Sequence, residues 1–397
     1  MLLRSLWLVA CCILLTGRAE AQGGSPQLPP PPPGWVFTPG VAVAQVWDNN
    51  VTLSTEVANQ NSSDFLTVIT PRGALGYRGR STSFNLNYIG SYELYQELNQ
   101  LNAYDQRLAT SFRQSLTRRL VFVSRNSLSR APSTDAIDVP GVIFRRQGVT
   151  MDDYRGGLEA RLSRHDTLSG LYTLEWLKYD DSGVPSPVAN LERGGHSQGA
   201  IINLDHVLNA RWTVGSEYEA RHAVVENARD FDVQTAVGTV DWRLDERFSV
   251  NGGLGYAWLA TVAGDPGQSA PTFRINLNRA GAQLAWHVGY RRSFIPSFGF
   301  GGRFSNQEFQ AGIEGQLSRR IEWRASMAVL QADPLSGTGP SVRSSWVRTN
   351  VSYAANRWIR IEGYYVGVFQ NTVLPGGRID RTRVGIQVAA ATRTRIH

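Results

Sequence analysis

The residues of this 397-residue chain that could do chemistry are charged side chains at alternating positions, not a catalytic constellation. The six histidines are scattered, and no spacing among them suggests metal ligation. No GxSxG nucleophile motif and no paired-carboxylate arrangement stands out. Two acidic pairs, Asp152-Asp153 and Asp180-Asp181, are compatible with plain solvation or with a calcium site. We therefore expect no enzyme activity, no cofactor and no dedicated metal centre.

The charged residues alternate with apolar ones along short segments. In one such segment, Arg274 and Asn276 alternate with Phe273, Ile275 and Leu277. A period of two indicates a strand that has one wet face and one apolar face. The charges that fall on the predicted wet faces are the candidate site residues. They are Glu159, Arg161, Glu217, Glu219, Arg221, Arg274, Arg291, Glu314, Glu322, Arg324, Arg348, Arg360, Glu362 and Arg383.

Short and long connections between these segments alternate strictly along the chain. Short breaks lie near residues 77–80, 116–119, 164–166, 208–210, 244–247, 279–283, 318–320 and 355–357. Longer polar connections occupy residues 49–64, 96–102, 131–148, 180–195, 226–230, 261–271, 297–302, 333–341 and 371–378. Short turns at one end, long loops at the other and an even strand number are typical of bacterial outer-membrane barrels. We therefore predict an all-β fold: a single transmembrane antiparallel β-barrel of about 18 strands, with short periplasmic turns and long outer loops.

In such a barrel the apolar face meets lipid and the polar face lines a wet lumen, and the sheet must close because lipid tolerates no open edge. Charges along a lumen set which solutes pass. They could equally pair across strands and only solvate the wall. Both signs occur, so we expect no strong ion selectivity. The segment from Leu120 to Arg130 is ambiguous, because Leu120–Val123 is apolar on both faces.

Aromatic residues cluster near the short breaks. Five of them predict an interfacial girdle on the periplasmic side, although aromatic residues also favour strands in general. They are Trp212, Trp242, Phe248, Trp323 and Trp358. The stretch Tyr290–Asn306 is rich in aromatic residues and glycine, and three interpretations remain open for it. It could fold inward as a constriction, bind a sugar by stacking, or be an exposed loop.

The N-terminus predicts export. Arg4, an apolar run from Leu6 to Leu15 and Ala19-Glu20-Ala21 form a secretory signal with an A-x-A cleavage site. A membrane anchor or a lipoprotein signal is the alternative. We assign residues 1–21 to the signal peptide, 22–35 to a proline-rich periplasmic lead-in and 36–397 to the barrel. Both cysteines, at positions 11 and 12, lie in this signal, so the mature chain has none.

Composition adds two exclusions. The net charge of +7 comes almost wholly from arginine, and Lys178 is the only lysine. The arginines sit singly along strands and in turns with no basic run, so nucleic acid is not an expected partner. No stretch of the mature chain approaches eighteen consecutive apolar residues, so we expect no transmembrane helix.

Two motifs resemble a known family. FTPGVAVAQVWDNNVTLS runs as an extended strand into Trp47–Val51. SSDFLTVITPRGALGYRGRSTSFNLNYIGSY has Pro71 in a descending strand, a tight turn and a strand that ends in Tyr88. These patterns resemble the beta-barrel porin-2 family over roughly Val36 to the C-terminus. The resemblance implies an outer-membrane location and an association with exopolysaccharide production and export, and it carries no catalytic residues. The chain departs from many barrels by ending at Ile396-His397 instead of an aromatic residue.

The sequence thus predicts an outer-membrane protein of a Gram-negative-type bacterium that forms a porin-like channel for small solutes or saccharides. Two alternatives stay open. One is a non-conducting barrel component of exopolysaccharide secretion or surface assembly, and the other is a soluble secreted β-protein. The expected partners are outer-membrane lipids, the barrel assembly machinery and polysaccharide or export components.

Overall fold

The computed structural model describes residues 34–53, 63–132, 148–180, 194–226, 230–261, 267–281, 283–297, 302–335, 341–372, 377–392 and 394–396. The predicted signal peptide and all of the lead-in before Gly34 lie outside these residues. Gly34 and Trp35, which we assigned to the lead-in, instead begin the first strand. No helix of the described chain is long and apolar enough to span a membrane.

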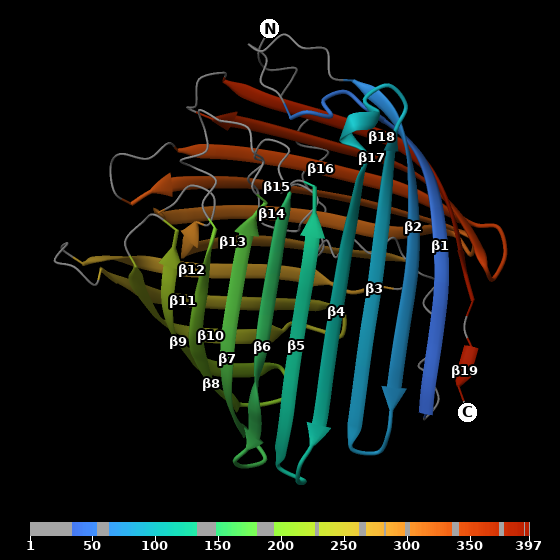
Figure 1. Ribbon diagram of the computed structural model, residues 1–397. Helices are drawn as coiled ribbons and strands as arrows, with labels where there is room; N and C mark the ends of the chain where they lie inside the picture. Colours follow the sequence, from blue (N-terminus) through green and yellow to red (C-terminus); the bar gives the residue numbers. More distant parts are fainter. Residues whose placement is uncertain are drawn as a thin grey trace, which may run out of the picture.

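Eighteen long antiparallel strands form one closed sheet, as predicted (Figure 1). Each strand pairs with its neighbours in sequence, and β1 closes the ring against β18. The strands are β1 (Gly34–Asp48), β2 (Asp64–Arg78), β3 (Thr82–Tyr95), β4 (Ala103–Ser115), β5 (Leu120–Ala131), β6 (Val149–Arg161), β7 (Asp166–Tyr179), β8 (Gly195–Val207), β9 (Trp212–Val225), β10 (Phe231–Arg243), β11 (Phe248–Thr261), β12 (Gln268–Arg279), β13 (Leu284–Ser297), β14 (Gly302–Ser318), β15 (Ile321–Pro334), β16 (Val342–Ala354), β17 (Ile359–Thr372) and β18 (Arg378–Ala391).

A short nineteenth strand, β19 (Thr394–Ile396), was not predicted. It pairs with Trp35–Phe37 of β1 in the same register as β18, so it continues β18 after an interruption. The interruption lies opposite Pro39, which has no N–H group to donate to the ladder. The carbonyl of Pro39 still accepts a hydrogen bond from the amide of Thr392 at 3.1 Å.

The eight short turns lie where the sequence predicts them, and six share one local geometry. In each of the six, a side-chain oxygen accepts hydrogen bonds from the backbone amides two and three residues later, which fixes a tight turn. The residues that supply this oxygen are Thr117, Ser163, Asn209, Asp245, Ser318 and Asn356. The two amides that bond Asp245 hold the pKa of its carboxyl below the usual range. The turns of β2–β3, β4–β5 and β6–β7 are at the bottom of Figure 1.

The register assigns every strand residue to one of two faces. On β1, Ala42, Ala44 and Val46 are buried, whereas Val41 and Val43 are nearly half exposed. The buried set faces the lumen. Directly paired residues lie on the same face of the sheet, and following these pairs from strand to strand around the ring gives a consistent assignment back to β18. The ambiguity of residues 120–130 is thereby resolved, since Val121 pairs with the lumen-facing Glu159 and Leu120 points outward.

The outer face carries the exposed apolar side chains. On β1 it begins at Trp35, continues through Phe37, Val41 and Val43, and ends at Trp47. The same arrangement occurs on β11, where Phe248 and Trp258 flank outward-facing apolar residues. Aromatic rings thus mark the outer surface near both the turn end and the loop end of the barrel.

Candidate functional site

The candidate site is the charged inner wall of the barrel. The register places all fourteen of the predicted wet-face charges on this wall. One contact shows that this wall is concave. Both terminal nitrogens of Arg274 on β12 donate to the carboxylate of Glu217 on β9, at 3.0 Å each. Strands β10 and β11 lie between β9 and β12, so these two side chains can meet only across the inside of the curved wall.

Most of these charges form ion pairs, and all but the Arg221–Glu219 pair, which lies within β9, join different strands. Ion pairs join Arg113 to Glu159 (2.8 Å), Arg221 to Glu219 (2.6 Å) and Glu175 (3.4 Å), Arg291 to Glu308 (2.6 Å), Arg324 to Glu314 (3.2 Å), and Arg360 to Glu322 (2.9 Å). Several of the partners keep a third to a half of their side chain exposed, so each pair contributes little to stability. The wall is therefore a hydrated network of both signs, and its effect on solute passage stays a prediction.

The two signs are separated around the ring. Strands β7–β10 contribute five inward carboxylates. Arg221 and Arg274, whose side chain extends from β12 to Glu217, neutralise them only in part. The carboxylates are those of Glu175, Asp205, Glu217, Glu219 and Asp241. Strands β16–β18 and β2 contribute mostly inward arginines, which Asp48, Asp64 and Glu362 neutralise only in part. The arginines are Arg72, Arg348, Arg360, Arg381 and Arg383. Because β8 and β17 lie half a turn apart in the closed ring, an acidic wall faces a basic wall across the lumen.

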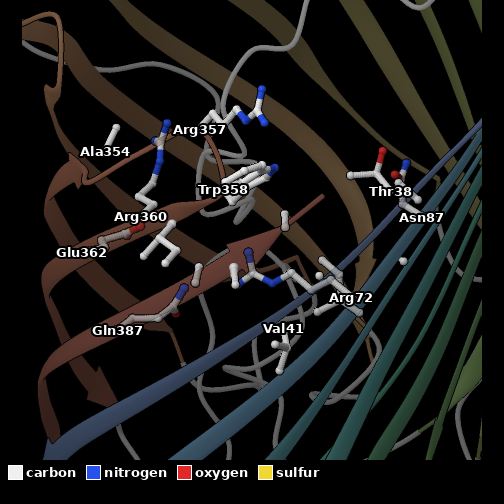
Figure 2. Close-up of a pocket in the computed structure, with 18 of the residues that line it drawn as sticks. Thr38, Val41, Arg72, Asn87, Ala354, Arg357, Trp358, Arg360, Glu362 and Gln387 are labelled. Carbon is white, nitrogen blue, oxygen red and sulfur yellow. The ribbon is translucent and has the colours of Figure 1, made fainter. Parts of the chain in front are cut away.

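A niche of about 130 Å³ opens in the basic wall beside the junction of β1 and β18 (Figure 2). Arg72 points into it from β2, and Arg360, Glu362 and Gln387 line the opposite side. Glu362 accepts a hydrogen bond from Asn350 at 2.8 Å, and Arg360 is held by Glu322. The Nε atoms of Arg72 and Arg360 are buried without a hydrogen-bond partner in the described chain. The niche thus presents cationic donors to whatever enters it.

A buried ion cluster ties β1 to β18 at the loop end. The carboxylate of Asp48 accepts hydrogen bonds from Arg381 (2.6 Å to Nη2) and from Arg383 (2.8 Å to Nε). Asp48 and Arg381 are almost fully buried. Asn49 and Asn50 extend the seam, since they bond the backbone of Thr382 and Asp380. The Trp47–Val51 motif of the family resemblance therefore has a structural role: it closes the barrel.

Apolar side chains pack on the inner face near the loop end. We call them the apolar collar. They are Leu66, Tyr95, Val149, Leu177, Val225, Phe231, Leu259, Phe304, Ala332 and Val342. All are buried, and Val51 of the first long connection packs against Leu66 and Tyr95. The lumen therefore changes along its length, from a polar, charged turn half to a loop end where apolar side chains pack beside the Asp48 ion cluster.

Four of the five predicted girdle residues lie on the outer surface near the turns; the fifth, Trp358, does not. Trp212 and Trp242 occupy directly paired positions on β9 and β10, with ring centroids 4.9 Å apart and planes nearly parallel. Phe248 contacts Trp286 edge-on at 6.0 Å, and Trp286 was missing from our predicted set. Trp323 lies opposite Gly315 on β14. Trp358 ends the last turn on the same side as the inward Arg360 and lines the niche, so its assignment to the girdle was wrong (Figure 2).

Sequence reasoning missed several wall residues. Asp48 lies in the Trp47–Val51 motif, for which the sequence suggests a family resemblance and no place in the wall. Arg72 follows Pro71 in a segment without a clear alternation of polar and apolar residues. Glu175 lies in a segment that is apolar on both faces, with Leu171 and Leu177 inside and Leu174 and Trp176 outside. No alternation signal marks such a residue.

The Tyr290–Asn306 stretch is mostly strand, not loop. β13 continues to Ser297 and β14 begins at Gly302, so only residues 298–301 connect them, and these lie outside the described chain. Within the described residues, no group of three or more His, Cys, Asp or Glu side chains could hold a metal ion.

Comparison with known proteins gave matches among solved structures only. No protein-family model and no curated protein matches the chain, so the resemblance to the beta-barrel porin-2 family is not confirmed. Similar structures include Pseudomonas aeruginosa OpdK with vanillate (10% identity, TM-score 0.45, 90% of this chain and 99% of that one). They also include P. aeruginosa OpdO (12%, 0.46, 91% and 97%) and Acinetobacter baumannii OccAB4 (9%, 0.47, 91% and 98%). No property of these proteins is transferred at such identities and TM-scores.

Proposed function

We propose that this chain is an outer-membrane channel for small polar solutes or saccharides. One observation carries the proposal: apolar side chains cover the outer face of a closed barrel whose inner face is charged. Leu254, Ile386 and Val351 are more than half exposed on the outside, and similar residues occur around the whole ring. A soluble secreted protein with so much exposed apolar surface would associate or aggregate. Lipid is the environment that satisfies this surface.

The height of the apolar surface supports a membrane span. Trp47 lies twelve residues after Trp35, and Trp258 lies ten residues after Phe248. At about 3.3 Å per residue and a strand tilt of about 40°, these intervals correspond to about 25–30 Å along the barrel axis. Outer-membrane barrels have an apolar band about 25 Å tall between two aromatic girdles. We infer that the short turns face the periplasm and the long loops the exterior.

The inner wall offers a physical basis for solute passage. Opposed acidic and basic walls create a field across the lumen, which would orient a dipolar solute such as a zwitterion or a charged sugar. The niche around Arg72 and Arg360 would bind an anionic group as the solute passes. The chain's role in this account is binding and guidance, with no covalent chemistry.

Planar-bilayer recording tests the proposal. The protein, purified from outer membranes, should give steady and reproducible conductance steps. Glu217→Gln should shift the cation-to-anion permeability ratio toward anions, since it removes a carboxylate of the acidic wall. Arg291→Gln, on β13, is the matched control of opposite sign, and should shift the ratio toward cations.

The apolar collar favours one alternative, a barrel without free conductance that serves polysaccharide secretion or surface assembly. Packed apolar side chains at the loop end would close the lumen by excluding water. Such a protein would fold and insert, yet stay silent in the same recording. Persistent silence from protein that shows heat-modifiable mobility would therefore contradict the channel and support this second function.

A further inference from the structure

The two ends of the barrel differ sharply in charge. The eight short turns between the strands hold nine arginines against one aspartate and one glutamate, Asp245 and Glu246. The nine long connections hold ten acidic residues and four arginines. The turn end therefore carries a concentrated positive charge, although the whole chain is only +7.

The arginines of the turns are available to an external partner. Arg118 and Arg119 follow β4, and Arg319 and Arg320 follow β14; all four are exposed. None of the four forms an ion pair with any residue in the described part of the chain. Clustered arginines repel one another unless an anion is bound between them. Solubility alone does not require such clustering.

One further arginine fixes the level of this charge relative to the membrane. The guanidinium of Arg279 lies 5.6 Å from the ring centroid of Phe248, the residue opposite it on β11. Phe248 belongs to the outer girdle with Trp212 and Trp242, whose amphipathic rings sit at the depth of lipid headgroups. The arginines of the adjoining turns therefore lie near the depth of the lipid phosphates.

We propose that the turn-end arginines bind the phosphate groups of anionic phospholipids in the periplasmic leaflet. The inference rests on the membrane location proposed above. A guanidinium matches a phosphate with two parallel hydrogen bonds, which a compact ammonium cannot do. A ring of such contacts around the turn end anchors the barrel at a fixed depth and holds its short turns toward the anionic leaflet surface.

Tryptophan quenching by brominated lipids tests this proposal. The protein is reconstituted in phosphatidylcholine bilayers that contain brominated phosphatidylglycerol, or brominated phosphatidylcholine as the reference. An arginine near an anionic surface contributes about fivefold in binding. We expect the native chain to prefer phosphatidylglycerol at least several-fold. The fourfold variant R118Q/R119Q/R319Q/R320Q should bring the preference close to one.

Two controls make the result specific. R343Q/R378Q removes two exposed arginines from the loop end and should leave the preference unchanged. The native preference should also fall as the ionic strength rises, since the Debye length shortens from about 30 Å at 0.01 M to about 3 Å at 1 M. Heat-modifiable mobility checks that each variant is folded.

An equal affinity of the native chain for both lipids would overturn the inference, as would a preference that survives in the fourfold variant. Failure of the channel proposal looks different. A native chain that conducts but shows no lipid preference refutes only the arginine contacts, whereas a chain that cannot be reconstituted in bilayers refutes the membrane location itself.

Discussion

Leu254 on β11 gives the sharpest test of which face of the barrel meets lipid. Its side chain is 71% exposed, between Gly238 of β10 and Phe273 of β12. It lies six residues after Phe248 and four before Trp258, near the middle of the outer apolar band. Leu254→Arg therefore places a charge close to the bilayer midplane.

The expected cost follows from this depth. An arginine on the lipid face costs about 2–4 kcal/mol at mid-bilayer, which is about 30-fold to 1,000-fold in the folding equilibrium. Asn251→Arg, on the same strand but on the inner face, is the matched control. Asn251 donates a hydrogen bond to Asp241, and an arginine could donate to the same carboxylate. We expect its effect to stay within about 0.5 kcal/mol.

Urea unfolding from phosphatidylcholine vesicles, followed by tryptophan fluorescence, measures both variants. The account predicts a lower midpoint for Leu254→Arg, with an unchanged slope, and a near-native midpoint for Asn251→Arg. Equal losses in the two variants, or a larger loss for Asn251→Arg, would refute the face assignment.

Three further changes test other parts of the structure. Asp48→Ala should lower the free energy of unfolding by about 3–5 kcal/mol because it leaves Arg381 buried without its carboxylate, and the double variant with Arg381→Met should recover stability; no recovery would contradict the buried pair. A double-mutant cycle on Trp212 and Trp242 should give a coupling of about 0.5–1.5 kcal/mol, and zero coupling would show that the stack contributes nothing. Asp245→Ala should lower the hydrogen-exchange protection factors of the two amides it caps, and Asp245→Asn should lower them less. Because the pKa of Asp245 is lowered, the charge-dependent part of the cap is present at neutral pH and is lost as the pH falls through that lowered value; protection factors that do not change with pH would argue against it.

The sequence predicted the architecture because loop length and side-chain alternation are local properties. All eight short turns lie where the pattern places them, and the alternation at Phe273–Leu277 assigned the faces of β12 correctly. The turns are recognisable because Thr117, Asn209 and similar residues cap their own backbone, which needs no distant partner.

The contacts that close the barrel were beyond such reasoning. Asp48 and Arg381 are 333 positions apart and meet only because β1 pairs with β18. The acidic and basic walls likewise depend on which strands lie half a turn apart. The apolar collar was missed because Leu177 and Phe231 lie inside the barrel, where the alternation rule expects polar residues. Here packing at the loop end overrides the rule.

Single-cysteine modification during channel recording tests the central claim most directly. The only cysteines, at positions 11 and 12, lie in the predicted signal peptide, so an introduced cysteine would be unique in the mature chain. Asn276 faces the lumen, opposite Asn251 and Gly289, and Ile275 beside it faces outward. A cationic methanethiosulfonate reagent should reduce the current through Asn276→Cys and leave Ile275→Cys unaffected. An unchanged current at Asn276→Cys, or a block at Ile275→Cys instead, would contradict a solute path along the charged inner wall.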